Sequence, residues 1–188
     1  MKSILFDVDG VLADFCYGFT KEAGVVPWSH TAQQTWQFPE DKIPLELRAA
    51  TWEKVTTTNN WWCALPAMAS GIAFNWISNM DTHNHMVFGT NRKGTPNAQY
   101  QTKRWLERKG IAHPNVVLTK FKGELAKVMK ADYAIDDSPE NAACIHWLSD
   151  ETKSYIIDRP YNRVSFLPKR VRRVSSVEEF LEDIRKGA

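Results

Sequence analysis

The sequence contains few cysteines, and their positions exclude two common kinds of stabilising site. The three are scattered and show no CxxC spacing: Cys16, Cys63 and Cys144. A disulfide framework or a structural zinc site needs more cysteines at closer, regular spacing. Long hydrophobic runs are also absent. Because a membrane-spanning helix needs about 18 or more consecutive apolar residues, we expect none.

A strong charge of either sign is missing as well. Lys and Arg total 24 and Asp and Glu total 22, which gives a net charge of +2. This balance does not favour a dedicated nucleic-acid binder. The basic run KRVRR at 169–173 could follow a phosphate backbone, but acidic residues follow it closely, so we interpret it as the solvated flank of a strand. The start, MKSILFDV, shows no signal peptide, and we expect a cytoplasmic protein.

Five short apolar runs, rich in Val, Ile and Phe, predict strands buried on both faces. Helix signals separate them: a Thr95-Pro96 start with a stop at Gly110, a Ser-Pro start at 138–139, and a capping box from Ser176 to Glu179. Strands that alternate with such helices predict an α/β fold, a Rossmann-like parallel sheet with helices on both faces. The runs occupy residues 3–8, 85–90, 115–119, 132–137 and 154–158.

Residues 16–80 interrupt this alternation and predict a small, mostly helical insertion after the first strand. They contain four prolines and a helical section at 44–55. We therefore expect a core made of residues 1–15 and 81–188, with the insertion over the carboxyl ends of the strands, where open α/β sheets bind ligands. Most of the tryptophans fall in the insertion, where they either fill the core or form a stacking pocket: Trp28, Trp36, Trp52, Trp61, Trp62 and Trp76.

Two pairs of acidic residues end two of the predicted strands. Asp7 and Asp9 follow the first apolar run, and Asp136 and Asp137 end the fourth. In a parallel sheet both pairs emerge at one edge, where like charges repel unless a cation lies between them. Mg²⁺ takes oxygen ligands, commonly one or two carboxylates together with substrate phosphate and water. The two pairs together therefore predict a magnesium site, whereas a lone DxD is more typical of a turn.

Two further places along the chain could bind a phosphoryl group. Thr90 ends the second predicted strand, and its hydroxyl and the N–H groups that follow could hold a phosphoryl oxygen, although a simple turn also explains the pattern. Lys120 and Lys122 precede a helical segment, and a lysine there would neutralise the charge of a phosphate and of the acidic residues. A single lysine is more often a solvated surface residue.

The order of these features resembles the haloacid dehalogenase superfamily of phosphotransferases. Its four motifs appear in the same sequence over residues 7–137: DxDG, an apolar run ending in Thr, a Lys at a helix start, and an apolar run ending in DD. The resemblance implies a residue for each role: the nucleophile Asp7, the general acid and base Asp9, the phosphate-binding hydroxyl of Thr90, the phosphate-site lysine Lys122, and the metal carboxylates Asp7, Asp9, Asp136 and Asp137.

Within that superfamily the sequence is similar to the cytosolic and mitochondrial 5′(3′)-deoxyribonucleotidases. The segments DVDGVLADF, VVLTKFK, AIDDSPEN and IIDRPYNR carry this similarity, and they favour Lys122 over Lys120. The likeness implies a small nucleotide substrate, aromatic residues of the insertion around its base, and a homodimer. We expect the substrate site to contain Phe15, Trp61, Trp62, Asn91 and Arg92.

Two positions depart from the resembled family and leave the substrate's identity open. The family usually has an arginine directly after the acidic pair, where this chain has Ser138, and a different sequence after the motif threonine, where this chain has Asn91, Arg92 and Lys93. We predict a Mg²⁺-dependent phosphomonoesterase that hydrolyses (deoxy)ribonucleoside monophosphates through an aspartyl-phosphate. The alternatives are a phosphatase of nucleic-acid ends or of a sugar phosphate, and a catalytically silent nucleotide-binding protein.

Overall fold

Six parallel strands form the central sheet of the structure, a computed structural model that describes residues 1–35, 42–92, 97–163 and 166–187. The strand order is β3-β2-β1-β4-β5-β6, and every neighbouring pair is parallel. This arrangement confirms the predicted fold class. The strands are β1 Ser3–Asp7, β2 His85–Thr90, β3 Asn115–Leu118, β4 Tyr133–Asp136, β5 Lys153–Ile157 and β6 Arg172–Val174.

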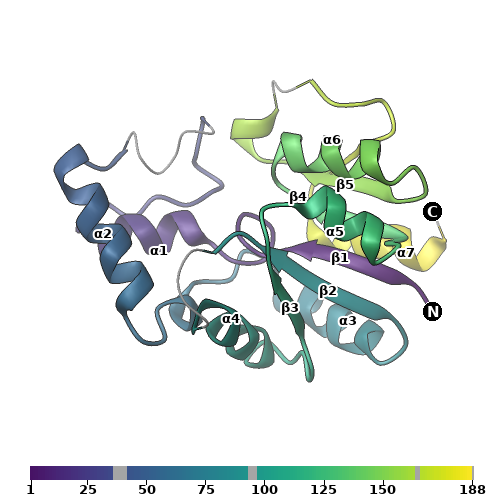
Figure 1. The fold of residues 1–188 in the computed structure, drawn as a ribbon, viewed down its shortest axis with the longest axis horizontal. Helices are drawn as coiled ribbons and strands as arrows, with labels where there is room; N and C mark the ends of the chain where they lie inside the picture. The colour runs from purple at the N-terminus through teal and green to yellow at the C-terminus, as the bar shows by residue number, and fades with distance from the viewer. Residues whose placement is uncertain (36–41, 93–96, 164–165, 188) are drawn as a thin grey trace.

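Helices cover both faces of this sheet (Figure 1). Helices α3, α4 and α7 pack on one face, and α5 and α6 pack on the other. The bounds of the helices are α1 Phe15–Glu22, α2 Leu45–Thr57, α3 Gly71–Asp81, α4 Asn97–Glu107, α5 Lys122–Val128, α6 Pro139–Leu148 and α7 Val177–Lys186, with short 3₁₀ helices η2 Trp62–Ala64 and η3 Pro160–Asn162.

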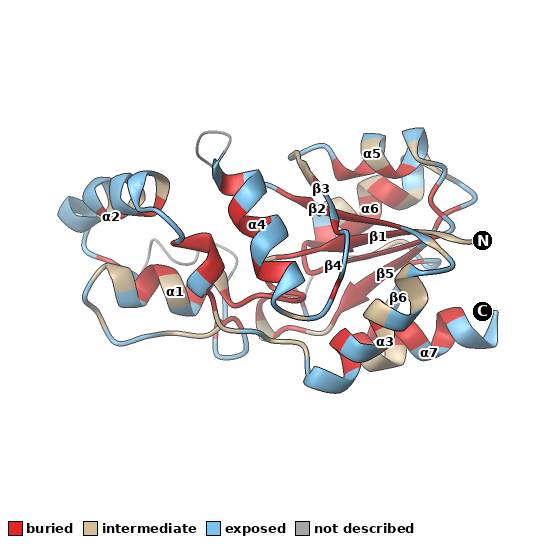
Figure 2. Ribbon diagram, turned by 90° about the horizontal axis from the view of Figure 1, so that it is seen from below, coloured by how far each residue is buried: buried red, intermediate tan, exposed pale blue. Residues whose placement is uncertain are grey.

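Successive side chains of each strand point to opposite faces, so the sheet supplies two hydrophobic layers. Phe6 belongs to the layer under α3, α4 and α7, where it stacks on Phe88 at 5.5 Å and meets Phe180 edge-on at 5.6 Å. Its neighbour Leu5 belongs to the layer under α5 and α6. Burial of each such side chain contributes about 1.5–3 kcal/mol. Figure 2 shows the buried strands between helices that are buried mainly on the side facing the sheet.

All five predicted strands are present, each within one residue of its predicted bounds. The sixth, β6, was not predicted, because two of its three residues are arginines from the basic run at 169–173. Lys169, Arg170 and Arg172 are exposed, in keeping with the solvated flank of a strand, and the run ends inside the strand itself. Arg173 donates to Asn162 O at 2.9 Å and lies 3.2 Å from the Asp158 carboxylate, so part of the run holds the edge of the sheet.

Two of the predicted helix starts are also present. The hydroxyl of Ser138 accepts a backbone N–H at the start of α6, and the hydroxyl of Ser176 does the same at the start of α7, each at 3.2 Å. The second half of the capping box is shifted by one residue, because the carboxylate of Glu179 accepts the N–H of the residue before Ser176. The predicted start at Thr95 and Pro96 lies outside the described residues.

Helices α1 and α2 form a lobe with η2 beyond the carboxyl ends of the strands, in residues 15–64 (Figure 1). Helix α3 also falls within the range predicted for the insertion, yet it packs against α7 on the face of the sheet. Its buried residues Ala73, Phe74 and Ile77 belong to the same hydrophobic core as the strands. The structure therefore places the last part of residues 16–80 in a core layer rather than in the lobe.

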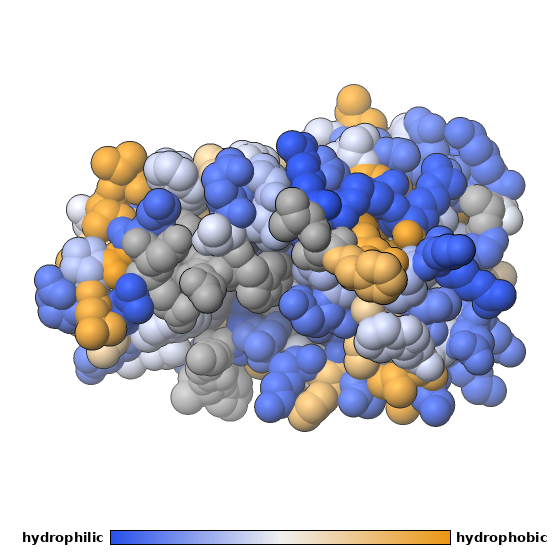
Figure 3. All heavy atoms as spheres, turned by 90° about the horizontal axis from the view of Figure 1, so that it is seen from above, coloured by the Kyte–Doolittle hydropathy of each residue, from blue (hydrophilic) through white to orange (hydrophobic). Residues whose placement is uncertain are grey.

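In the described part of the chain, no helix combines the length and the apolar character that a membrane span requires. On the face seen in Figure 3, apolar atoms form separate groups among hydrophilic side chains. Scattered apolar residues of this kind are normal on folded proteins.

Candidate active site at the ends of β1 and β4

The strand order reverses between β1 and β4, and the candidate site lies at the carboxyl ends of these two neighbours. Open α/β sheets bind ligands in the crevice at such a switch point. Phe6 of β1 pairs with Ile135 of β4, so the next residue of each strand, Asp7 and Asp136, reaches the same edge at the same level. The sheet register thus brings Asp7 of the first predicted acidic pair next to Asp136 of the second.

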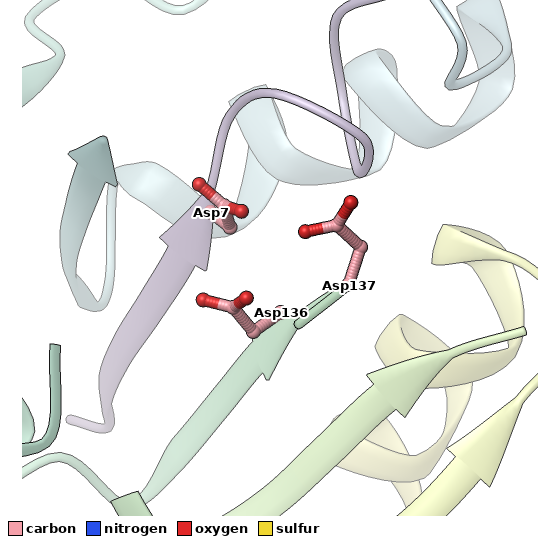
Figure 4. A group of neighbouring side chains, drawn as sticks. All are labelled: Asp7, Asp136 and Asp137. Atoms are coloured by element: carbon pink, nitrogen blue, oxygen red, sulfur yellow. The ribbon is translucent and has the colours of Figure 1, made fainter. Parts of the chain in front are cut away.

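Three aspartates form one buried cluster at this edge. Asp7, Asp136 and Asp137 each offer a carboxylate oxygen within 4.8 Å of the others, and Figure 4 shows the three side chains gathered at the ends of β1 and β4. Lys122, the first residue of α5, completes the group: its Nζ lies 2.6 Å from Asp7 Oδ1 and 2.8 Å from Asp136 Oδ2. Lys120, the other lysine considered, is exposed and lies over an aromatic ring.

The cluster holds more negative charge than its lysine balances. Burial raises the pKa of Asp7 well above its usual value; Lys122 opposes this rise, while the charges of Asp136 and Asp137 add to it. Burial raises the pKa of Asp137 as well, and Asp136 increases the effect. Burial alone would lower the pKa of Lys122, but Asp136 and Asp7 together outweigh it and raise that pKa. Three buried carboxylates and one ammonium group therefore favour an additional cation.

This donor set fits a hard divalent cation such as Mg²⁺, which takes oxygen ligands and usually keeps some water. Asp136 is held in place for such a role, because its Oδ1 accepts the N–H of Ser138 at 2.9 Å and the amide of Asn141 at 3.1 Å. Asp137 accepts the hydroxyl of Tyr161 on Oδ2. Fixed carboxylates of this kind are typical of metal ligands, since their hydrogen-bonding partners orient them.

Gly10 allows the turn after β1 to pass close to Asp137. Its φ of +83° lies in the left-handed region, and a Cβ there would stand 1.9 Å from Oδ2 of Asp137. Arg159 supports the same turn by donating its Nε–H to the carbonyl of Gly10 at 2.9 Å. Glycine is therefore required at this position for both the backbone conformation and the approach to the cluster.

Asp9 lies outside the cluster, which differs from the predicted set of four metal carboxylates. Its Oδ2 accepts the hydroxyl of Thr90 at 3.1 Å and the Nε–H of Arg92 at 3.0 Å, and its Oδ1 accepts an Nη2–H of Arg92 at 2.9 Å. The physical reason is that a guanidinium binds both oxygens of one carboxylate in a single plane. The side chain of Asp9 is therefore paired with Arg92 instead of joining Asp7.

A cleft of about 340 Å³ opens between the aspartate cluster and the lobe. The predicted residues Asp7, Asp9, Phe15, Trp62, Thr90, Asn91, Arg92, Lys122 and Asp137 all line it. Asp136 lies beneath them, fully buried. Trp61 is not part of the lining. Its ring packs against Gly18, and its Nε1 donates to Glu22 at 3.2 Å.

Aromatic rings form the wall of the cleft on the side of the lobe. Phe15 lies 5.7 Å from Trp62 and 5.7 Å from Trp52 between ring centres, and it is nearly parallel to both. Trp52 was not singled out from the sequence, although α2 turns it into the cleft. The tryptophans thus serve both expected uses, core filling for Trp61 and a cleft wall for Trp52 and Trp62. Trp36 lies outside the described residues.

The sequence reasoning also missed a buried acid–imidazole pair at the rim of the cleft. Asp14 caps α1 and lies 2.8 Å from Nδ1 of His30, which lines the cleft. Burial would raise the pKa of Asp14, but the hydrogen bonds from His30 and Ser29 outweigh it and lower that pKa. The one local signal was the position of Asp14 just before a helix, which is typical of an N-cap.

Solved structures share this fold, although no protein-family model and no curated protein matches the sequence. A HAD family hydrolase from Deinococcus radiodurans R1, with bound phosphate and sodium, aligns at 12% identity over 99% of this chain and 96% of that chain, with a TM-score of 0.61. The D,D-heptose 1,7-bisphosphate phosphatase from B. bronchiseptica, complexed with magnesium and phosphate, aligns at 13% identity over 100% of both chains, with a TM-score of 0.57.

A third neighbour is the defluorinating L-2-haloacid dehalogenase Rha0230, at 11% identity over 98% of this chain and 95% of that chain, with a TM-score of 0.59. The chain therefore has the fold of haloacid dehalogenase-type hydrolases. Because the neighbours include both a phosphatase and a dehalogenase, the fold alone does not choose the reaction, and the choice depends on the residues of the site.

Proposed function

We propose that the chain is a phosphomonoester hydrolase that acts on nucleoside monophosphates, with Mg²⁺ at the aspartate cluster. The observation that carries the proposal is the buried Lys122, which bridges Asp7 and Asp136 while a separate acid, Asp9, faces the same cleft. A carboxylate nucleophile, positive charge for the phosphoryl oxygens and a separate proton donor are the groups that phosphoryl transfer through an aspartate needs. A dehalogenase has no use for the proton donor.

Asp7 supplies the nucleophile. Its Oδ1 accepts the N–H of Val8 at 2.6 Å and lies 2.6 Å from Nζ of Lys122, so Oδ2 is the oxygen that attacks phosphorus. As the Oδ2–P bond forms, the bond from phosphorus to the ester oxygen breaks, which gives an aspartyl-phosphate. Lys122 faces the cleft and stabilises the charge on the phosphoryl oxygens. The hydroxyl of Thr90, which donates to Asp9 in this structure, would turn to a phosphoryl oxygen when substrate binds.

Asp9 moves the protons in both steps. It donates a proton to the departing ester oxygen, and then takes a proton from the water that attacks the aspartyl-phosphate and releases inorganic phosphate. Mg²⁺, when held by Asp7, Asp136 and Asp137, supplies further positive charge to the phosphoryl group. The pairing of Asp9 with Arg92 keeps its carboxylate separate from these three residues.

The aromatic wall supports a nucleotide as the substrate. Phe15, Trp52 and Trp62 together present ring surfaces to the cleft, against which a planar base can pack. The volume of about 340 Å³ is within the range of clefts that bind small molecules. A sugar phosphate has no planar group to use this wall, so the wall favours a nucleotide.

Release of inorganic phosphate from a panel of substrates, with Mg²⁺ or with EDTA, tests the proposal. The panel contains purine and pyrimidine nucleoside monophosphates with ribose or deoxyribose, a sugar phosphate and a 5′-phosphorylated oligonucleotide. We expect Mg²⁺-dependent release with the highest kcat/KM for a mononucleotide. Preference for the sugar phosphate or the oligonucleotide would overturn the substrate class and keep the chemistry.

The variant Asp7→Asn tests the nucleophile. An amide oxygen is a poor nucleophile, so turnover should fall to background while nucleotide binding persists. Asp150→Asn, at an exposed position, is the matched control and should keep full activity. Phosphate release measures turnover, and fluorescence of the tryptophans near the cleft measures binding. Turnover by Asp7→Asn would contradict the assignment, and binding without turnover in the unaltered protein would favour a silent nucleotide-binding protein.

A further inference from the structure

Arg92 is a buried cation at the junction between the sheet and the lobe. Its side chain is 1% exposed, and its Nε and Nη2 atoms donate to the two oxygens of Asp9 at 3.0 and 2.9 Å. Among the residues that the structure describes, Arg92 forms the only ion pair of Asp9. A guanidinium with these contacts has few N–H groups left for a substrate, although we expected Arg92 in the substrate site.

Two contacts on its other sides fix the guanidinium of Arg92. Its Nη1 donates to the hydroxyl of Thr102 in α4 at 2.8 Å, and its central carbon lies 4.8 Å from the centre of the Trp62 ring. Trp62 is joined to α4 in turn, because its backbone N–H donates to Oε1 of Gln101 at 2.9 Å. Helix α4 and the lobe therefore set the orientation of Arg92 together.

We propose that Arg92 is a positioning residue, which aims Asp9 at the departing ester oxygen and takes its own orientation from Thr102 and Trp62. The proposal rests on the phosphatase function proposed above. The two-point contact fixes the plane of the Asp9 carboxylate. Trp62 thus contributes to proton transfer as well as to the wall of the cleft.

Leaving-group dependence separates this role from a merely structural one. A nucleoside monophosphate releases an alkoxide-like oxygen that needs a proton, whereas p-nitrophenyl phosphate releases a stable phenolate that does not. Because kcat/KM reports the steps up to the first phosphoryl transfer, it isolates the step in which Asp9 acts as an acid. A variant in which Asp9 no longer points at the ester oxygen should lose kcat/KM selectively for the nucleotide.

We expect Arg92→Met to lower kcat/KM for a nucleoside monophosphate by about 100-fold or more, in the range for loss of general acid catalysis. The loss for p-nitrophenyl phosphate should be less than about fivefold, since that phosphoryl transfer needs no acid. Arg92→Lys keeps the charge but not the two-point contact, so it should restore only part of the nucleotide activity. Asp9→Asn sets the reference for complete loss of the acid.

Thr102→Val removes the Nη1 acceptor without touching the cleft, so it tests the same mechanism when Arg92→Met folds poorly. Thr51→Val in α2 is its matched control, because both threonines are buried and both hydroxyls donate to the carbonyl four residues earlier at 2.7 Å. We expect Thr102→Val to show a smaller loss than Arg92→Met with the same preference for the better leaving group. Thr51→Val should leave both substrates unchanged.

The outcomes distinguish failure of the inference from failure of the proposed function. Equal losses on the two substrates in Arg92→Met and Thr102→Val, beside a selective loss in Asp9→Asn, would overturn the positioning role and leave the phosphatase reaction intact. An Asp9→Asn variant with no leaving-group dependence would overturn the assignment of Asp9 and thereby the reaction proposed above. A selective nucleotide loss in all three variants would support both.

Discussion

Replacing Gly10 with alanine tests whether the turn after β1 keeps Asp137 in the aspartate cluster. The new Cβ would lie 1.9 Å from Oδ2 and 2.5 Å from Cγ of Asp137, so the carboxylate must move. Oδ2 is also the atom that accepts the hydroxyl of Tyr161, and its displacement breaks that hydrogen bond. The φ of +83° at Gly10 adds backbone strain for any residue with a side chain.

The expected cost of Gly10→Ala therefore has two parts. The left-handed backbone costs an alanine about 1–2 kcal/mol. Loss of a buried hydrogen bond to a charged group costs about 1.5–3 kcal/mol. The free energy of unfolding should fall by about 2.5–5 kcal/mol in total. Affinity for Mg²⁺ should fall by about 10–100-fold, the size of effect seen when the groups that orient a metal ligand are lost.

Gly110→Ala separates the two parts. Gly110 has a φ of +94° and nothing within 4 Å of the position of a Cβ, so alanine there adds only the backbone strain. Urea unfolding measures the free energy of each variant, and the shift of the melting temperature with Mg²⁺ concentration measures metal affinity. The Gly110 variant should lose about 1–2 kcal/mol and bind Mg²⁺ normally.

Two results would refute the reasoning. One is equal loss of stability in Gly10→Ala and Gly110→Ala with unchanged Mg²⁺ affinity, which would mean that the approach of Gly10 to Asp137 has no role in the cluster. The other comes from the double variant with Asp137→Ala. Removing the carboxylate removes the collision, so Gly10→Ala should then cost only the backbone strain, and full additivity would contradict the predicted contact.

Three further predictions follow from the charges of the site. Lys122→Met should lower the free energy of unfolding by about 3–5 kcal/mol at pH 8 in urea titrations, because removing one member of a buried ion pair leaves charge uncompensated. Burial raises the pKa of Asp7 and Asp137, so the folded state keeps protons that the unfolded state releases above about pH 4. Without metal, the free energy of unfolding should therefore decline as the pH rises above about 4. Saturating Mg²⁺ should flatten this dependence of stability on pH. Asp14 affects stability in the opposite direction, because the hydrogen bond from His30 outweighs burial and lowers the pKa of Asp14. Its contribution to the free energy of unfolding is present above about pH 4 and is lost as the pH falls through the pKa of the folded state. Asp14→Asn should therefore make stability depend less on pH in the acid range.

The strands and their acidic ends could be predicted because the signals are local. A short apolar run marks a strand buried on both faces, and a parallel sheet brings the ends of all its strands to one edge. The meeting of Asp7 with Asp136 follows from position alone. Strand β6 gave no such signal, because it has three residues and forms by pairing with β5. Pairing with β5 therefore holds these residues as a strand, although their own sequence carries no strand signal.

The partners of the site residues could not be predicted, because they join distant parts of the chain. Asp9 and Arg92 are 83 positions apart, and no local pattern tells whether the carboxylate turns toward a metal or toward a guanidinium. The same holds for Trp52 and Trp61, which both belong to the lobe. Trp52 reaches the cleft, whereas Trp61 packs against Gly18, and only the packing of α1 against α2 and η2 decides this.

We predict that the proposed phosphatase activity depends strictly on a metal, because of the balance of charge in the cleft. Ser138 stands where the family that the sequence resembles usually has an arginine. It caps α6 and donates to Glu140 at 2.9 Å, so it adds no positive charge. Of the cationic side chains that line the cleft, Arg92 is paired with Asp9, and Lys122 is paired with Asp7 and Asp136, so little positive charge is left for a phosphoryl group. EDTA should therefore abolish phosphate release rather than weaken it, and added Mg²⁺ should restore it. Substantial turnover in EDTA would contradict this charge balance.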